Sequence, residues 1–314
     1  KWAFEQCAPF LRMQNVEFCF CDVKPFSFKE IFSFPADILS QINECTAYYT
    51  PYCNIPAGIT IPVYSTIHDV VFLDIKGLAS PFGNFIRKLM YLRAIDYSKA
   101  VFTVSEFSKE RILKRLHCKK PVFVGYNGIS NWITKQNTAE NSSGKENTVL
   151  FVGNIKKHKG LSVLLSAFLK VQKQLPGIKL VIVGNSENFR TGDEETLQKI
   201  KAVPDGSISF TGKISNEDLV KQYKKAKLLV QPSFYEGFGI PPLEALYCKT
   251  NVILSDIPVF KELYSRFPVT FFTCGDDSDL AKKIIEHIND VPPENIPQIY
   301  SYKNTVNIIS ATIK

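Results

Sequence analysis

The stretch TVLFVGNIKKHKGLSVLLSAFLKVQKQLPGIKLVIVG, residues 148–184, decides the fold. Its two ends, 148–152 and 179–183, are short apolar runs of the length that β-strands have in globular proteins. An amphipathic helix is predicted over 161–174, because a polar loop precedes it and Pro176-Gly177 stops it. A strand, a helix and a second strand in this order form a parallel βαβ unit.

The same alternation extends outward on both sides of this stretch. Ser105 is a good helix N-cap, and Ser215 and Asp218 have the spacing of a capping box. Further elements are predicted as strands over 61–67, 100–104, 121–125, 207–211, 228–231 and 251–254, and as helices over 82–97, 105–117 and 216–225. We therefore predict an α/β protein of two Rossmann-like lobes, with parallel sheets and a ligand-binding interdomain cleft.

A polar segment at 134–147 (TKQNTAENSSGKEN) divides the chain. It has almost no apolar residues and is rich in Asn, Ser and Lys, so it cannot bury a core and is predicted to be a linker. A length of 314 residues also favours two domains. We expect domains over 1–146 and 147–299, with a C-terminal helix at about 300–314 that packs back on the first domain.

Composition excludes several classes of protein. With 45% hydrophobic and 22% charged residues the chain has an ordinary globular composition, and no apolar run approaches the length of a transmembrane helix. None of the eight cysteines forms a CxxC pair or a zinc-type cluster, so we interpret them as buried free thiols in a reducing compartment. Cys19 and Cys21 would share one face of a strand. These features favour a cytoplasmic protein.

Positive charge is concentrated between residues 85 and 120. This stretch holds ten Lys and Arg against three Asp and Glu, in a chain whose formal net charge is +8. Such a stretch is often a solvated helical face, and it could also attract an anionic membrane surface or a nucleic acid. A nucleic-acid stacking platform would need aromatic residues alternating with glycines, which this stretch does not have.

The densest functional signal is PSFYEGFGIPPLE, residues 232–244. A strand ends here, a glycine-bracketed loop carries Glu236, and Pro241 opens a helix whose N-terminus can hold a phosphate. Glu244 falls in the predicted first turn of that helix. Taken singly, Glu236 could be a solvated loop acid, and Glu244 a carboxylate that satisfies the helix start. Their eight-residue spacing within one strand–loop–helix unit favours a ligand site.

Two further loops carry candidate residues. In GNIKKHKG, residues 153–160, the four residues from 156 to 159 can all be cationic just before a helix, which suits a diphosphate, although a solvated basic turn would look the same. Since this loop and residues 232–244 follow strands of one predicted sheet, both should face the same cleft. His68 follows a predicted strand in the first lobe, where it could hydrogen-bond a sugar hydroxyl or merely cap the strand end.

At these loops the sequence resembles the family 4 glycosyltransferases, retaining enzymes of the two-lobed GT-B fold. The family's hallmark, two glutamates with seven residues between them, is matched by Glu236 and Glu244. Other segments typical of the family are matched by Val152–Gly160, His68-Asp69, Thr103–Glu110, Asn127-Gly128 and Phe210–Gly212. The likeness runs from about residue 49 to about residue 310.

The resemblance implies a role for each matching residue. Glu244 would hold the ribose hydroxyls of the donor, Glu236 would bond its sugar, and Lys159 would bind its diphosphate. The implied catalytic residues are His68, Glu236 and Lys159, and the implied donor-binding residues are Asn154, Lys156, Lys159, Gly184, Ile214, Glu236, Gly237, Phe238, Gly239, Ile240 and Glu244. Many members carry Arg where Asn154 stands, so Lys156 or Lys157 would supply part of the phosphate clamp.

The resemblance also implies the reaction and its partners. It implies no cofactor and no metal, with a nucleotide diphosphate-sugar as co-substrate and a glycan or lipid-linked acceptor bound on the side of the N-terminal domain. No Asp-x-Asp pair stands at a strand end in the expected cleft. We predict a retaining, metal-independent hexosyltransferase that builds a cell-surface polysaccharide or glycolipid. It would attach peripherally to the inner face of the cell membrane through residues 85–120, and it would not bind nucleic acid.

Residues 1–45 show no strand and glycine-rich loop of the kind that opens the family's first lobe. We expect that loop to be missing from this sequence or diverged. One alternative is a nucleotide-sugar epimerase of the same fold, which would lack the paired glutamates; the other is a non-catalytic nucleotide-sugar binder. We expect Glu244→Ala and Lys159→Ala to weaken donor binding and spare the fold, because both side chains would lie on the rim of the cleft.

Overall fold

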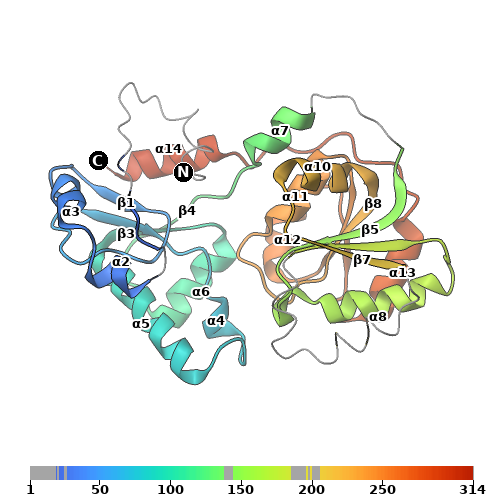
Figure 1. The fold of residues 1–314 in the computed structure, drawn as a ribbon, viewed down its shortest axis with the longest axis horizontal. Helices are drawn as coiled ribbons and strands as arrows, with labels where there is room; N and C mark the ends of the chain where they lie inside the picture. The colour runs from blue at the N-terminus through green and yellow to red at the C-terminus, as the bar shows by residue number, and fades with distance from the viewer. Residues whose placement is uncertain are drawn as a thin grey trace. The chain divides into compact units, whose positions relative to one another are not determined.

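The computed structural model describes residues 19, 21–24, 27–137, 144–184, 196, 199 and 206–313. The chain divides into two compact units, one formed by residues 1–128 together with 300–314 and the other by residues 129–299. Each unit contains one sheet, and every strand pairing in both sheets is parallel (Figure 1). The predicted α/β class with two parallel-sheet lobes is confirmed.

The first unit is built on a four-stranded sheet in the order β1-β2-β3-β4. Because neighbouring strands are parallel, each connection has to cross back over the sheet. The strands are β1 (Tyr48–Thr50), β2 (Val63–Thr66), β3 (Ser98–Thr103) and β4 (Val122–Val124). The helices of this unit are α2 (Phe28–Phe32), α3 (Ala36–Asn43), α4 (Val71–Asp74), α5 (Pro81–Tyr97), α6 (Glu106–Leu116) and α14 (Tyr302–Thr312).

Helix α14 joins the sheet of the first unit although it lies at the other end of the chain. Isoleucines 308, 309 and 313 pack against Tyr64 on β2 and Phe102 on β3. The Thr305 hydroxyl donates a hydrogen bond to the Tyr126 carbonyl. The last residues of the chain therefore supply part of the apolar cover of this sheet.

The second unit is built on a six-stranded sheet in the order β10-β9-β8-β5-β6-β7. Its strands are β5 (Glu146–Val152), β6 (Lys179–Val183), β7 (Ile208–Gly212), β8 (Ala226–Gln231), β9 (Asn251–Ser255) and β10 (Thr270–Phe272). The chain runs from β5 outward to β7, returns to the other side of β5 as β8, and runs outward again to β10. This is a doubly wound sheet with its switch point between β5 and β8.

Helices cover both faces of this sheet. Helix α8 packs against α13 on one side, and α7, α10 and α11 pack together on the other (Figure 1). The buried side of α8 includes Leu164 and Phe168, which contact the same apolar core as Phe151 of β5. The helices whose bounds are described in this unit are α7 (Asn131–Asn137), α8 (Leu161–Gln172), α10 (Asn216–Lys225), α11 (Ile240–Tyr247), α12 (Pro258–Tyr264) and α13 (Asp277–His287), with a 3-10 turn, η2, at Lys157–Lys159.

Local signals at helix starts agree with the structure. Ser105 caps α6 by accepting a hydrogen bond from the Ser108 amide. Ser215 caps α10 by accepting one from the Asp218 amide, and its hydroxyl donates to the Asp218 carboxylate. The N-cap half of the predicted capping box is therefore confirmed, whereas the Asp218 carboxylate contacts the Ser215 hydroxyl in place of the backbone N–H that a full box uses.

The predicted linker is too long at both ends. Residues 134–137 complete α7, and Glu146 and Asn147 begin β5; residues 138–143 lie outside the described part of the chain. Helix α7 belongs to the second unit because it packs on α10 and α11, so the units divide at 128/129 where the sequence analysis had placed the boundary at 146/147. The polar composition of residues 134–137 could not reveal that they continue a helix.

The interpretation of the cysteines is partly wrong. The seven cysteines in the described residues are free, but only Cys118 and Cys248 are buried, and Cys19, Cys21 and Cys45 are exposed. Cys19 and Cys21 lie in chain without regular structure rather than on a strand. Cys7, and most of the segment expected to carry the first lobe's opening loop, lie outside the described residues.

Within the described ranges, no helix is both long enough and apolar enough to cross a membrane.

Candidate active site

The candidate site lies at the switch point of the six-stranded sheet. Strands β5 and β8 are neighbours, so the loops that follow them, residues 153–160 and 232–239, begin side by side at the carboxyl edge of the sheet. The Phe234 amide donates a 2.8 Å hydrogen bond to the His158 carbonyl and joins the two loops. Ligands of open α/β sheets bind at such switch points.

Gly160 allows the two loops to approach this closely. Its φ is +70°, and a Cβ placed on it would lie 1.9 Å from the Pro232 carbonyl oxygen. No side chain fits there, and L-residues also disfavour this backbone conformation. A glycine at the end of the basic loop is thus a packing requirement of the site.

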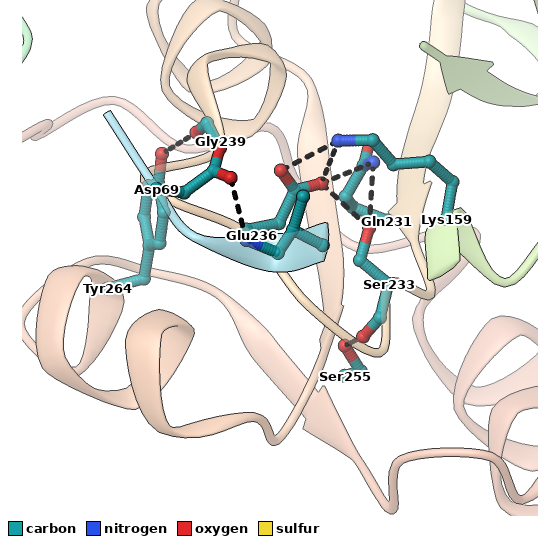
Figure 2. Close-up of polar contacts among 9 residues, drawn as sticks. Asp69, Lys159, Gln231, Ser233, Glu236, Gly239, Ser255 and Tyr264 are labelled. Carbon is teal, nitrogen blue, oxygen red and sulfur yellow. Dashed lines mark hydrogen bonds and ion pairs between the residues drawn. The ribbon is translucent and has the colours of Figure 1, made fainter. Parts of the chain in front are cut away.

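Lys159 and Glu236 form the polar centre of the site. The Lys159 ammonium lies 2.7 Å from both carboxylate oxygens of Glu236. Glu236 Oε1 also accepts hydrogen bonds from the Ser233 hydroxyl at 2.8 Å and from Gln231 Nε2 at 3.4 Å (Figure 2). Glu236 is 8% exposed, and the Lys159 side chain is 21% exposed. The prediction treated Glu236 as a loop acid, which it is by position, but it is held by three side chains rather than solvated.

The support of this carboxylate extends to the next strand. Gln231 Nε2 donates to the Ser233 hydroxyl at 3.2 Å, and the Ser255 hydroxyl at the end of β9 donates to the Ser233 carbonyl. Both Ser233 and Gln231 are buried. A carboxylate fixed in this way loses little conformational freedom when it binds a ligand, which is the usual benefit of a preorganised site.

His158 does not add to the positive charge of the loop. It is buried, and burial together with the neighbouring Lys159 ammonium lowers the pKa of His158 to about 4. The imidazole is therefore neutral near pH 7, and the four residues expected to be cationic supply three lysine charges. Lys156 and Asn154 are exposed on the same loop.

The start of α11 presents few backbone donors. Its first residue is Ile240, and the two prolines that follow have no N–H, so the donors near the helix start come from the 237–240 backbone. The Tyr264 hydroxyl donates to the Gly239 carbonyl and holds this turn (Figure 2). Phe238 is buried and Gly237 is half-buried. The predicted anion site at this helix start is thus confined to the loop backbone.

Glu244 lies deeper than the sequence analysis predicted. Since α11 begins at Ile240, Glu244 stands in the second turn, and no side chain caps the helix start. Its carboxylate is 5% exposed and accepts hydrogen bonds from the Tyr223 hydroxyl at 2.9 Å and the Ser130 hydroxyl at 3.4 Å. Burial raises the pKa of Glu244 to about 7, against the opposing effect of these two hydrogen bonds.

Two of the remaining predicted residues follow the strands β6 and β7. Gly184, directly after β6, packs against the Gly153 carbonyl and lies near the Asn154 amide. Ile214 follows β7 and is half-buried. Both stand at the carboxyl edge of the same sheet, as predicted from their places after strands.

His68 belongs to the first unit. It follows β2, its side chain is exposed, and its Nε2 lies 2.9 Å from the Pro51 carbonyl oxygen. The structure thus brings Lys159 and Glu236 into direct contact, and it places Glu244 on the same helix–loop unit as Glu236. His68 keeps its predicted position at a strand end.

Comparison with known proteins identifies the family. Residues 133–304, more than half of the chain, match the family described as "Glycosyl transferases group 1". The chain belongs to the group 1 glycosyltransferases. The matched range includes Lys159, Glu236 and Glu244.

Individual relatives agree with this assignment. The chain is 30% identical over 241 residues to the O-antigen chain mannosyltransferase RfbU of Salmonella typhimurium, covering 74% of this chain and 64% of that protein. It is 24% identical over 231 residues to the O-antigen chain mannosyltransferase B of Escherichia coli, covering 69% and 58%. The chain therefore spans less than two thirds of the length of these relatives.

Solved structures share the fold of this group 1 glycosyltransferase. The Anabaena HepE protein, crystallised with UDP and glucose, aligns with a TM-score of 0.60 at 18% identity, covering 88% of this chain and 78% of that one. At this identity the likeness establishes the two-lobed GT-B fold.

Sequence reasoning missed six residues of the candidate site. Four of them, Gln231, Ser233, Ser255 and Tyr264, support Glu236 or the loop that carries it, and two, Tyr223 and Ser130, bond Glu244. Gln231 and Ser233 directly flank Pro232, and two polar side chains at the end of an apolar strand could have drawn attention to them. The other four come from distant segments, and only the folded chain shows their contacts.

Proposed function

We propose that this protein is a retaining family 4 glycosyltransferase that moves a sugar from a nucleotide diphosphate donor to a hydroxyl acceptor. The observation that carries the proposal is the Lys159–Glu236 pair, which is fixed at the switch point of a doubly wound sheet by Ser233 and Gln231. Family membership makes glycosyl transfer the chemistry that such a pair serves.

In this proposal Lys159 stabilises the leaving diphosphate. A lysine ammonium has three N–H donors, and two of them are directed at Glu236. The third can reach a phosphate oxygen while the carboxylate keeps the side chain in place. Together with the 237–240 backbone, this cation supplies the charge stabilisation that a metal ion supplies in other transferases, so we propose a reaction without metal or other cofactor.

Glu236 would contact the donor sugar. As the bond to the phosphate breaks, positive charge develops on the sugar ring, and the acceptor hydroxyl approaches on the face that the phosphate leaves. Oε1 of Glu236 accepts from Lys159, Ser233 and Gln231, whereas Oε2 accepts from Lys159 alone among the described residues. Oε2 can therefore accept one hydrogen bond from a sugar hydroxyl without reorganising. His68 would serve the same sugar from the first unit.

Glu244 would hold the donor's nucleoside. A carboxylate has about four acceptor positions, and Tyr223 and Ser130 use two of them. The remaining positions suit the two hydroxyls of a ribose. Asn154, Lys156, Gly184 and Ile214 would complete the donor site along the same sheet edge.

The decisive experiment measures turnover. Purified protein is incubated with a panel of radiolabelled nucleotide sugars, release of nucleoside diphosphate is followed, and the anomeric configuration of the product is read by NMR. A retained configuration and a rate unchanged by EDTA support the proposal. An inverted product, or a rate that collapses in EDTA and returns with Mg²⁺ or Mn²⁺, contradicts it; binding without turnover would favour a non-catalytic binder.

We further propose that the acceptor is a glycan or lipid-linked glycan of a cell-surface polysaccharide, handled at the inner face of the membrane. The names of two relatives, both O-antigen chain mannosyltransferases, support this class of product. The surface of α5 supports the membrane location: Phe82, Phe85 and Leu89 lie three and four positions apart and are 73%, 56% and 45% exposed. An exposed apolar row beside cations is the pattern of a helix that lies in a membrane interface.

The cations of residues 85–120 are not all available to a membrane. Arg111 and Arg115 both pair with Asp74, whose side chain is 5% exposed, and their guanidinium groups lie 2.5 and 2.6 Å from its Oδ1. Lys88 and Lys114 are exposed. The interface we propose is therefore the row Phe82–Phe85–Leu89 with Lys88 and Lys114.

Co-sedimentation with vesicles of phosphatidylcholine, with and without phosphatidylglycerol, tests this interface. Each lysine near an anionic surface contributes about 1 kcal/mol, so Lys88→Glu/Lys114→Glu should weaken binding to anionic vesicles at least about tenfold, and high salt should do the same. Lys282→Glu, on the exposed side of α13 in the other unit, is the matched control. Equal binding to both kinds of vesicle, or equal loss in the control, would leave the lysines as a merely solvated face.

A further inference from the structure

Hydrogen bonds hold both the backbone carbonyl and the side-chain hydroxyl of Tyr223, although this residue lies on a mostly polar helix. Its side chain is 0% exposed, and its backbone carbonyl, at the end of α10, accepts hydrogen bonds from the Thr250 hydroxyl and from Lys145 Nζ. From this anchored position the ring reaches α11, where its hydroxyl donates a 2.9 Å hydrogen bond to Glu244 Oε2. Because Tyr223 is completely buried, close packing holds its ring in this position.

This contact has two physical consequences for Glu244. It fixes the direction of the carboxylate, because Oε2 is held by Tyr223 and Oε1 by Ser130. It also favours the charged form: burial raises the pKa of Glu244 to about 7, and the Tyr223 hydroxyl is the larger of the two hydrogen bonds that oppose the rise.

We propose that Tyr223 is a positioning residue for the donor site, which presents Glu244 as an oriented carboxylate to the ribose of the nucleotide. The inference rests on the proposed function, since it takes Glu244 as the nucleoside contact. It adds a residue from a different helix, 21 positions before Glu244, that never needs to touch the donor.

The groups around Glu244 limit how pH can act on it. Tyr223 stands opposite on α10, Ser130 precedes α7, and Cys248 lies one turn on along α11. The charge of Lys145 opposes the rise in the pKa of Cys248, and Tyr264 adds to the rise in the pKa of Tyr223. Burial lowers the pKa of Lys145 itself to about 8. Burial raises the pKa values of the Cys248 thiol, to about 12, and of the Tyr223 hydroxyl, so neither ionises near pH 7. Glu244 and Lys145 are the two groups of this cluster that titrate between pH 6 and 9.

The test compares UDP and GDP, and the 2′-deoxy form of each, by isothermal titration calorimetry with Tyr223→Phe. The variant keeps the ring and removes only the hydroxyl. The ratio of affinities for the ribo and deoxy forms isolates the ribose contact, and it cancels the titration of the diphosphate and of Lys145. Tyr64→Phe, which removes the hydroxyl of a buried tyrosine on β2 of the other unit, is the matched control.

We expect the protein to bind the ribo form about tenfold more tightly than the deoxy form at pH 7, which is the usual effect of one hydrogen bond to a charged group. In Tyr223→Phe this preference should fall to about twofold to threefold at pH 7 and recover at pH 9, because the loss of the hydroxyl raises the pKa of Glu244. Recovery at high pH is an effect that a simple packing defect would not produce. Tyr64→Phe should keep the preference at both pH values.

Glu244→Gln separates the two possible failures. If Glu244→Gln keeps the ribo preference, Glu244 is not the nucleoside contact and the proposed donor site is wrong. If Glu244→Gln loses the preference while Tyr223→Phe keeps it at pH 7, the inference about Tyr223 is overturned and the donor site stands. An equal loss in Tyr223→Phe at pH 7 and 9 supports the inference and shows that Tyr223 acts on the orientation of the carboxylate rather than on its charge.

Discussion

Replacing Lys159 with methionine should destabilise the second unit even in the absence of any ligand. The change keeps an unbranched side chain of similar length and removes the ammonium that lies 2.7 Å from both oxygens of Glu236. Glu236 is 8% exposed and would keep only the neutral donors of Ser233 and Gln231. Lys159 is half-buried and Glu244 is buried, so neither side chain lies on an open rim, and we expect the loss of either to cost stability.

The magnitude follows from the burial of the pair. Removing one partner of a buried ion pair costs about 3–5 kcal/mol. Lys159 is 21% exposed, so water can partly solvate Glu236 in the variant, and we reduce the expected cost to about 2–3 kcal/mol. For a unit of this size about 1 kcal/mol lowers the Tm by about 2–4 °C, so the expected decrease is about 4–12 °C.

Differential scanning calorimetry of the ligand-free protein measures this decrease. The matched control is the double variant Lys159→Met/Glu236→Gln, which removes both charges and leaves no buried unpaired ion. It should regain at least half of the lost stability. A single variant that melts within about 2 °C of the wild type, or a double variant less stable than the single one, would refute the reasoning, because the two groups would then not depend on each other.

Three further predictions concern single residues. The raised pKa of Glu244, about 7 against 4.5 in the unfolded chain, makes its stabilising effect complete below about pH 4.5 and lost as the pH rises through 7. In thermal melts from pH 5 to 8, Glu244→Gln should therefore gain stability relative to wild type as pH rises, by up to about 3 kcal/mol; a constant difference would contradict the raised pKa. Gly160→Ala should separate the two loops, since its Cβ would lie 1.9 Å from the Pro232 carbonyl oxygen, and should abolish turnover; an active variant would show that the loops need not touch. Gly128→Ala places a Cβ 2.3 Å from the Tyr302 amide and should destabilise the first unit by about 1–3 kcal/mol, measured by urea unfolding, whereas an unchanged midpoint would show that the α14 segment can shift at no cost.

Local patterns in the sequence were sufficient for the architecture. The stretch at 148–184 predicts β5, α8 and β6 to within two residues at each end, because apolar periodicity and a Pro-Gly stop are properties of neighbouring residues. The caps Ser105 and Ser215 were predictable for the same reason. The places of Glu236 and Lys159 in loops after strands, and of Glu244 in the helix that follows, also came from the sequence. So did the parallel order that puts these loops at one edge of a sheet.

Partners in space were decided only by the tertiary structure. Lys159 and Glu236 are 77 residues apart, and their pairing depends on β5 and β8 being neighbours at the switch point. The Tyr223 hydroxyl meets Glu244 only because α10 and α11 pack on the same side of the sheet. The sequence does not show whether a charged side chain is solvated or buried. Its burial, its pKa and the loss of stability on removing it could therefore not be predicted from the sequence. The sequence determined which residues stand at the edge of the sheet, and packing decided which of them hold one another.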